Sequence, residues 1–526
     1  MAQTMVAGAR APVEDALPAR RIFAFVAMVF GMFMAILDIQ VVSASLAEIQ
    51  AGLSAGSDEI AWVQTAYLIA EVIMIPLSGT LARIMSTRVL FTISAAGFTI
   101  ASALCATATN IDQMIVYRAL QGFIGGGMIP SVFAAAFTVF PPSKRNIVSP
   151  IIGLVATLAP TIGPTVGGYL TSALSWHWLF LINVVPGILV SIAAWTLIDF
   201  DKPEKGLMAK FDWWGLLAMG TMLGCLEYVL EEGSAHDWLN DQTILVVFIA
   251  MLIGGVVFFW RAFKVEFPIV DLKAFGNVNF AFGSVFSFVL GIGLYGLTYL
   301  YPLYLGRIRH YDSMMIGETL FISGLCMFLT APIAGILSNK IDLRLMMMIG
   351  FLGFAAGTFS MSQLTSDWSF QELLIPQIFR GVSMMLCMVP INNLALGTLH
   401  PSRIKGGSGL FNLTRNLGGA VGLAIINTIL TNRTANHYER LAENVTWSNP
   451  QAVQQLNQMT FNNTMNGLDG LAAATRQLSN MVRQQALILS FIDVLLILTV
   501  LFAGLAAFTL LMKKPGKPPA GAGGGH

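Results

Sequence analysis

The sequence predicts an all-α polytopic membrane protein with fourteen transmembrane helices, grouped as six, two and six. Hydrophobic residues make up 56% of its 526 residues and charged residues only 11%, whereas soluble domains carry about 25% charged residues. Fourteen apolar stretches approach the roughly 20 residues that a helix needs to cross a bilayer. The lipid bilayer is therefore the first partner that we expect for this chain.

The expected spans fall into three groups, because a charged stretch, DFDKPEKGLMAKF, divides the chain after the sixth span. The spans lie near residues 22–46, 60–82, 88–107, 111–138, 147–172, 178–198, 212–231, 242–262, 278–303, 314–337, 344–364, 371–397, 407–431 and 486–512. We expect an N-terminal tail, a six-helix bundle, an inserted helix pair with flanking loops, a second six-helix bundle and a C-terminal tail, over residues 1–21, 22–198, 199–276, 277–512 and 513–526.

The distribution of Lys and Arg predicts the orientation. With the N-terminus inside, the inner loops and both tails hold 20 of the 29 basic residues, the outer loops hold 6, and 3 lie within spans. Because cytoplasmic loops carry an excess of Lys and Arg, we expect both termini to be cytoplasmic.

Composition also argues against several classes of function. The net charge of +1, without a clustered basic face, indicates no nucleic-acid partner. The four cysteines lie inside apolar spans and no CxxC or His pair occurs, so we expect neither disulfides nor a metal site. No GxSxG, HExxH or phosphate-cradling loop occurs, and we therefore predict that the protein is not an enzyme and has no cofactor.

The fourth span carries a charge that cannot face lipid. Arg118, Gln121 and Gly125 fall at i, i+3 and i+7 and share one helix face. A charge near the bilayer centre costs at least about 2.5 to 3.5 kcal/mol on insertion scales, so Arg118 should face a partner or a wet cavity inside a bundle.

The fifth span is built for close packing and bending. Ala159, Gly163 and Gly167 stand at i, i+4 and i+8, and Pro160 and Pro164 lie beside them. Small residues at this spacing let two backbones approach closely. We assign a conformational or packing role to a set of four residues, Gly163, Pro164, Gly167 and Gly168.

These two spans resemble the major facilitator superfamily. RALQGFIGGG is similar to the superfamily's fourth-helix motif RxxQGxGxA, and APTIGPTVGG is similar to its fifth-helix motif GxxxGPxxGG, which points to exporters. The resemblance implies the major facilitator fold, in which two six-helix halves are related as a parallel repeat.

The first span contains a buried carboxylate, Asp38, some 17 residues past Arg21 and so near mid-membrane. Such a carboxylate is either protonated or paired. It is a candidate proton carrier, and the alternative is a permanently hydrogen-bonded structural residue. AILDIQVVSASLAEI is similar to the LDxTIVNVALP motif of fourteen-helix drug/proton antiporters, with Leu37 and Asp38 retained and Gln40, Ser43 and Ala47 departing from it.

The second span carries two polar residues on one face, Gln64 and Glu71, at i and i+7. Gln64 and Gln121 are candidate cavity residues, while Glu71 is a candidate for proton coupling or a local polar contact. The span ends in GTLARIMSTR, similar to the superfamily's GxLaDrxGrr loop, but Arg83 and Ser86 replace its Asp and second Gly. The charge relay proposed for that loop therefore cannot operate unchanged here.

The inserted pair contains Glu227, about four turns inside its span, while Glu231 and Glu232 are expected at the outer interface. Glu227 could serve proton coupling together with Asp38, Arg118 and Glu71, or it could be paired structurally.

In the second half, Tyr295 and Tyr299 suggest an aromatic cavity wall. QIFRGVSMM places Arg380 where Arg118 stands in the first half, and FNLTRNLGGAVG, similar to the family's FxRxLGGAxG stretch, buries Arg415. We therefore add Arg380 and Arg415 to the candidate cavity.

Residues 432–485 form a polar outer segment that is too long for a connector, and we expect short helices or a hairpin there. Its role is either to dock an adaptor or to act as a lid over the cavity.

From residue 22 to the Gly-rich tail, the chain resembles EmrB-like drug/proton antiporters. The resemblance implies export of lipophilic or amphipathic compounds in exchange for protons, with the proton gradient as energy source and, in many relatives, a membrane-fusion adaptor and outer-membrane channel. It also implies a contribution to antibiotic resistance. The alternatives are a narrow-specificity exporter or symporter of the same fold, for a siderophore or metabolite, and a non-transporting receptor or scaffold.

Overall fold

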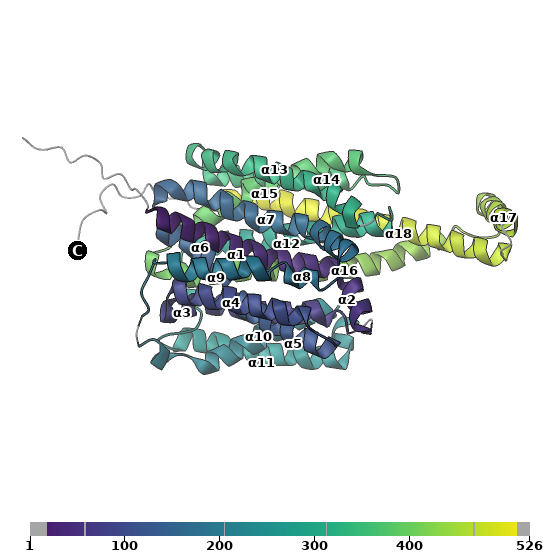
Figure 1. Cartoon of the computed structure of the whole chain (residues 1–526). Helices are drawn as coiled ribbons and strands as arrows, with labels where there is room; N and C mark the ends of the chain where they lie inside the picture. Colours follow the sequence, from purple (N-terminus) through teal and green to yellow (C-terminus); the bar gives the residue numbers. More distant parts are fainter. Residues whose placement is uncertain (1–17, 57–58, 205, 312, 466–468, 513–526) are drawn as a thin grey trace, which may run out of the picture.

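The computed structural model describes residues 18–56, 59–204, 206–311, 313–465 and 469–512. The expected C-terminal tail, 513–526, lies outside the described residues, as does the N-terminal tail up to residue 17. Figure 1 shows long, nearly parallel helices packed side by side into one bundle. The described residues contain no strand.

Every expected span is occupied by a helix. Thirteen helices or helix pairs of the described chain are long and apolar enough to cross a membrane. A fourteenth span, α7, bends by 42° between its halves Val148–Ala159 and Ile162–Ala173. The spanning helices are α1 (Ala19–Ala44), α3 (Trp62–Met85), α4 (Thr87–Ala106), α5 (Ile111–Gly125) with α6 (Met128–Val139), α7 (Pro142–Ala173), α8 (Trp178–Leu181) with α9 (Val184–Leu197), α10 (Trp213–Glu232), α11 (Gln242–Lys264), α12 (Val278–Arg307), α13 (Ser313–Lys340), α14 (Leu343–Met361), α15 (Phe370–Ala395), α16 (Ile404–Ala442) and α18 (Gly470–Phe508).

Two spans that the sequence predicted as continuous are broken. The fourth divides into α5 and α6 at Gly126 and Gly127. A Cβ at Gly126 would lie 3.1 Å from the Glu71 carbonyl oxygen, so glycine allows α3 to approach closely at the break. The sixth span divides into α8 and α9 around Asn183.

The two halves meet along several helices. Within the N-terminal half, α5 packs against α3 and α4, and α9 packs against α1 and α4. Within the C-terminal half, α12 packs against α16 and α14 packs against α15 and α18. Between the halves, α7 packs against α13 and α3 against α16. The inserted α10 packs on α3 and also on α16, whereas α11 packs mainly on α10.

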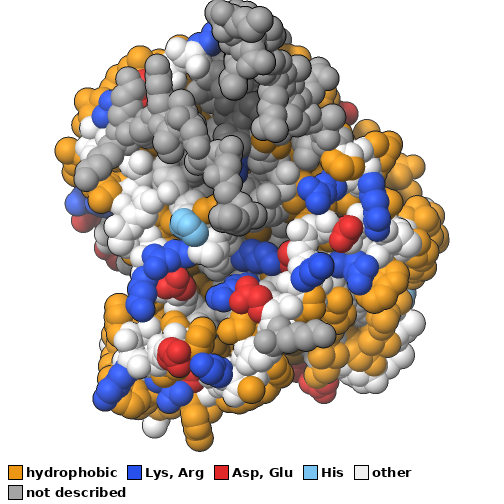
Figure 2. Space-filling model, turned by 90° about the vertical axis from the view of Figure 1, so that its left-hand side faces the viewer, with side chains coloured by type: hydrophobic (Ala, Val, Ile, Leu, Met, Phe, Trp, Pro, Cys, Tyr) orange, Lys and Arg blue, Asp and Glu red, His pale blue; other side chains and the backbone are white. Residues whose placement is uncertain are grey.

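We call the end at which α1 begins the inner end and the opposite end the outer end, after the orientation predicted from charge. Figure 2 views the inner end and shows many Lys and Arg side chains on it. Here the halves are in contact. Lys405 of α16 forms an ion pair with Asp201, which follows α9. Ser149 donates a 2.7 Å hydrogen bond to Asn393. A Cβ at Gly79 would lie 2.7 Å from the Lys405 carbonyl oxygen, so α3 and α16 are closely apposed.

At the outer end, α16 and α18 extend beyond the bundle and carry α17 (Pro450–Met465), as Figure 1 shows. The expectation of short helices or a hairpin for residues 432–485 is therefore confirmed. His437 and Asp493 hold the two long helices together through a contact of 2.9 Å.

Candidate functional site

A buried ion pair joins α1 to α5. Arg118 donates a hydrogen bond of 2.6 Å from Nη1 to Asp38 Oδ2, and both side chains are 0% exposed. Asp38 Oδ1 accepts two further bonds, of 3.1 Å from Gln121 and 2.7 Å from Asn183. Asp38 lies within about two turns of the outer end of α1, nearer that end than the mid-membrane position that we expected.

The surroundings of Arg118 hold its guanidinium in place. Its Nε donates to the Val63 carbonyl oxygen at 3.1 Å, its Nη1 also donates to Gln121 at 2.6 Å, and its charge lies 4.3 Å from the centre of the Tyr67 ring. Its Nη2 has no hydrogen-bond partner among the described residues. Arg118 thus meets the partner that its buried helix face required, and it keeps one free donor.

Three members of this cluster were not singled out from the sequence: Tyr67, Ser102 and Asn183. Ser102 accepts a 2.7 Å hydrogen bond from Gln121, and Asn183 comes from the break between α8 and α9. The only available signal was the Asn of WHWLFLINVVPG, a polar residue inside an apolar run.

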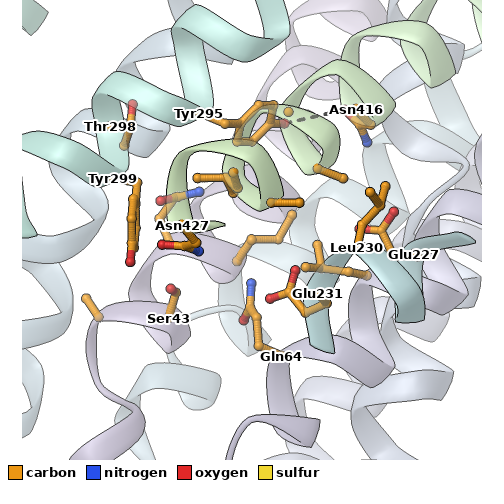
Figure 3. A pocket seen from close by; sticks show the side chains of 18 of the residues that line it. Ser43, Gln64, Glu227, Leu230, Glu231, Tyr295, Thr298, Tyr299, Asn416 and Asn427 are labelled. Carbon is orange, nitrogen blue, oxygen red and sulfur yellow. Dashed lines mark hydrogen bonds between the residues drawn. The ribbon is translucent and has the colours of Figure 1, made fainter. Parts of the chain in front are cut away.

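A cavity of about 490 Å³ lies in the outer half of the bundle, between α1, α3, α7, α10, α12, α13 and α16. Three of the expected cavity residues, Gln64, Tyr295 and Tyr299, line it. Figure 3 shows Gln64 and Glu231 on one side of this space and Tyr299 and Asn427 on the other. Tyr295 donates a 3.4 Å hydrogen bond to Asn416.

Three carboxylates line the cavity: Glu71, Glu227 and Glu231. Glu71 is 2% exposed, and its Oε1 has no hydrogen-bond partner among the described residues. Glu227 is 6% exposed. Glu231 lies at the outer end of α10, is partly exposed and also lines the cavity, a role that the sequence did not indicate.

The carboxylate of Glu71 lies between the ion pair and the cavity in its electrostatic interactions. The charges of Arg118 and Asp38 both act on Glu71, and the charges of Glu71 and Glu231 both act on Glu227. A series of carboxylates therefore runs from the buried ion pair to the outer part of α10.

Three residues that we expected in the cavity do not line it. Gln121 belongs to the Asp38 cluster. Arg380 donates a 2.6 Å hydrogen bond to Thr298, which does line the cavity, so Arg380 supports its wall from behind. Arg415 lies 5.0 Å from the centre of the Phe133 ring, across the contact between the two halves.

The glycines of α7 face α1. A Cβ at Gly167 would lie 2.9 Å from the Val41 carbonyl oxygen and 3.0 Å from Ser45 Oγ, and a Cβ at Gly163 would collide with Gln40. Pro164 lines the cavity, whereas Gly168 is half-buried. The face of small residues thus packs against a neighbouring helix.

The loop after α3 carries Arg83 where the superfamily motif has an Asp, and the carboxylate of Asp201 lies beside this loop. Asp201 accepts hydrogen bonds of 3.0 Å from the Thr87 backbone N–H and 3.0 Å from the Thr87 hydroxyl, and it pairs with Lys405. Arg83, which replaces the motif Asp, pairs instead with Glu204 at 2.9 Å. The stretch after α9 therefore supplies the acidic group that the loop itself has lost.

Two packed helical halves, buried charges and a cavity between them are typical of membrane transporters that expose a central site alternately to each side. The chain belongs to the Major Facilitator Superfamily, whose sequence pattern matches residues 28–423.

Relatives match nearly the whole chain. It is 41% identical to the colistin resistance protein EmrB of Acinetobacter baumannii over 502 aligned residues. These residues make up 95% of this chain and 98% of that protein. It is 30% identical to the fatty acid resistance protein FarB of Neisseria gonorrhoeae, over 94% and 96% of the two chains. It is 28% identical to the multidrug export protein EmrB of Escherichia coli, over 95% and 96%.

Solved structures share the fold. The human organic anion transporter MFSD10 superimposes with a TM-score of 0.55 at 13% identity, covering 92% of this chain and 100% of that one. An inward-facing bacterial homologue of the human lysosomal transporter Spinster gives a TM-score of 0.52 at 13% identity, covering 94% and 98%.

Proposed function

We propose that this protein is a proton-driven efflux permease of the bacterial inner membrane that exports lipophilic or amphipathic compounds. The observation that carries the proposal is the cavity lined by Glu71, Glu227 and Glu231, which lies next to the buried Asp38–Arg118 pair. A carboxylate can hold a proton or a cationic partner but not both, and this competition couples the two fluxes.

The mechanism follows from alternating access. In this structure the halves are in contact at the inner end and the cavity lies toward the outer end. A proton entering from outside neutralises a cavity carboxylate and weakens its hold on a cationic drug. The proton leaves after the cavity has turned to the inner side, and the carboxylate is then ready for another drug molecule.

Arg118 transmits protonation to the helices. Protonation of Asp38 removes the negative charge that holds Nη1 of Arg118. The Nη2 of Arg118 has no hydrogen-bond partner among the described residues, and the charge of Arg118 interacts with that of Glu71. A shift of Arg118 from Asp38 toward Glu71 replaces a contact between α5 and α1 by a contact between α5 and α3. Protonation of the buried pair can in this way change the packing of α3, which forms part of the cavity wall.

The relatives support export as the direction of transport. Their names refer to colistin resistance, fatty acid resistance and multidrug export. The projecting helices α16–α18 fit a docking site for a membrane-fusion adaptor that leads to an outer-membrane channel, because they extend beyond the bundle and α17 is largely exposed.

Drug accumulation tests the proposed function. Cells that express the protein should accumulate several unrelated lipophilic compounds less than cells without it, and collapse of the proton gradient should remove the difference. A narrow-specificity exporter would lower only one compound, and an uptake symporter would raise accumulation. Equal accumulation with and without the protein would favour a non-transporting receptor.

A further inference from the structure

We propose that the C-terminal half binds a small monovalent anion, such as chloride, between α12 and α15, with Arg380 and Gln377 as its hydrogen-bond donors. The ion supplies from solution the negative charge that Asp38 supplies within the N-terminal half. Such a site is separate from the export function proposed above and can be tested without transport.

The helix α15 repeats the polar face of α5 with its two groups exchanged. Arg118 and Gln121 follow the first residue of α5 by seven and ten positions. Gln377 and Arg380 follow the first residue of α15 by the same two intervals. Arg380 therefore corresponds to Gln121, and not to Arg118 as we expected from the sequence. In each helix the two residues are spaced i, i+3 and share one face.

The two helices are also packed alike. A glycine follows each pair directly. A Cβ at Gly122 would collide with the Tyr67 carbonyl oxygen of α3, and a Cβ at Gly381 would collide with the Ser323 carbonyl oxygen of α13. Since α3 and α13 are the second spanning helices of their halves, the two polar faces lie in corresponding surroundings.

The two faces differ in the negative charge that they meet. In the N-terminal half the Asp38 carboxylate accepts hydrogen bonds from both Arg118 and Gln121. In the C-terminal half the first spanning helix, α12, offers Thr298, whose uncharged hydroxyl accepts a 2.6 Å hydrogen bond from Arg380 Nη2. Arg380 forms no ion pair with any residue that the structure describes. The C-terminal half thus buries a positive charge without a counter-charge from the described chain.

Unused polar atoms mark the place for an anion. Nη1 of Arg380 and both polar atoms of the Gln377 amide have no hydrogen-bond partner among the described residues. The two residues are only 4% and 1% exposed. An isolated buried charge is costly, and a guanidinium cannot lose its proton to avoid the cost. An anion that accepts from Arg380 and from the Gln377 amide removes this cost.

The aromatic neighbour of Arg380 does not replace an anion. The centre of the Tyr301 ring lies 5.4 Å from the guanidinium carbon. An aromatic face attracts a cation through its quadrupole, but it carries no net charge. The Tyr301 ring therefore leaves the charge of Arg380 unbalanced.

Burial and charge together define the class of anion. Two side chains that are almost fully buried can admit a small ion more readily than a bulky one. One negative charge balances Arg380, whereas a second would itself be a buried charge without a partner. Thr298 lines the cavity, where Figure 3 shows it, so an ion can reach Arg380 past this side chain. A bound ion in turn fixes this part of the cavity wall.

The test measures thermal unfolding of the purified full-length protein in lipid nanodiscs. The buffers contain sodium chloride, acetate, sulfate or gluconate at equal ionic strength. Gluconate is the reference, because it is too bulky for a site enclosed by buried side chains. Chloride and acetate distinguish an inorganic ion from a carboxylate group, and sulfate tests the preference for a single charge.

Three variants locate the effect. Arg380→Met removes the guanidinium, and Thr298→Asp places a carboxylate next to it. The matched control is Arg415→Met, because Arg415 is also a buried arginine of the C-terminal half. Its guanidinium carbon lies 5.0 Å and 5.2 Å from the ring centres of Phe133 and Phe411, on a different helix from Arg380.

We expect chloride to raise the unfolding temperature of the wild type by about 3 °C relative to gluconate, and sulfate to raise it by less than about 1 °C, because a ligand of the folded state stabilises that state. Arg380→Met and Thr298→Asp should show no chloride effect, since the first lacks the binding group and the second carries its own negative charge. In gluconate, Thr298→Asp should unfold at a higher temperature than the wild type. Arg415→Met should keep the chloride effect.

Stabilisation by acetate in place of chloride would keep the anion site and assign it to a carboxylate group. The proposal is overturned if neither chloride nor acetate stabilises the wild type relative to gluconate, or if sulfate stabilises it as strongly as they do. It is also overturned if the effect persists in Arg380→Met or Thr298→Asp, or disappears in Arg415→Met. Should Arg380→Met fail to fold, the comparison of Thr298→Asp with the wild type decides.

Discussion

Arg118 donates a 2.6 Å hydrogen bond to Asp38 at a point where neither side chain reaches solvent. Removing one member of such a pair leaves an uncompensated buried charge, which costs about 3 to 5 kcal/mol, whereas removing both members costs much less. The pair therefore makes folding stability and proton coupling separable by experiment.

We expect Asp38→Asn to abolish proton-driven export, because an amide cannot titrate. The protein should still insert in the membrane, but its unfolding free energy should fall by about 3 to 5 kcal/mol. Asp38→Asn combined with Arg118→Gln should regain most of that stability and none of the coupling. The measurements are transport against a pH gradient in vesicles and thermal unfolding of the purified protein. Wild-type transport by Asp38→Asn would refute the assignment of Asp38.

Arg118→Lys should impair coupling while the protein stays folded. Lysine keeps the charge but loses the planar fork with which Arg118 reaches Asp38, Gln121 and the Val63 carbonyl at once. We expect proton-driven transport to fall by at least about tenfold, since hydrogen bonds to charged groups contribute about 1.5 to 3 kcal/mol each. Normal export by Arg118→Ala would contradict the role of the buried pair.

Gly167→Leu should block the transport cycle. The added side chain would enter the space in which α7 meets Val41 and Ser45 of α1, and such overpacking costs about 1 to 3 kcal/mol. Gly504→Leu is the matched control, because Gly504 is exposed on α18 and has open space around it. Export assays should show loss of activity in the first variant only. Equal activity of the two would mean that the α1–α7 contact is unimportant for the cycle.

Asp201→Asn should loosen the inner end by weakening the ion pair with Lys405. In a background with all four native cysteines replaced by serine, Ser408→Cys reports access to the buried contact between the halves. We expect maleimide labelling to rise roughly two- to fivefold, in keeping with a contact of about 0.5 to 1 kcal/mol. Glu204→Gln, which removes the exposed pair with Arg83, should leave labelling unchanged. Unchanged labelling in Asp201→Asn would show that this pair does not hold the inner end closed.

Deletion of residues 440–478 distinguishes the two roles of the outer helices. If they dock an adaptor, transport in reconstituted vesicles is retained and drug resistance in cells with two membranes is lost, which is the result that we expect. If they act as a lid over the cavity, transport fails in vesicles as well. A deletion with full resistance in cells would exclude both roles.

The fold was largely predictable, because apolar length identifies spanning helices one by one and the spacing of Arg118 and Gln121 identifies a buried face. The contacts of that face were not predictable. Asp38 and Arg118 are 80 residues apart, and no local pattern states which helices become neighbours. Asn183 escaped notice because a single amide at a helix break resembles a local turn residue.

The contribution of Glu231 to the cavity was missed for a similar reason. Its place in the span gave its depth correctly, near the outer end of α10. The direction in which it points depends on how the inserted helix is rotated against α3 and α16, which hydropathy does not encode. The distinction matters because a carboxylate at the same depth can face lipid headgroups or a cavity.

The length of α16 has a mechanical consequence. It is a single helix of 39 residues, about 58 Å long. Lys405 near one end meets Asp201, Asn427 borders the cavity, and His437 near the other end meets Asp493. If α16 moves as a rigid rod about a point beside the cavity, it works as a lever, and separation of the inner ends moves the projecting ends of α16 and α18. A protein bound to these projecting ends would then respond to opening of the inner end and, by reciprocity, would favour one state of the transporter over the other.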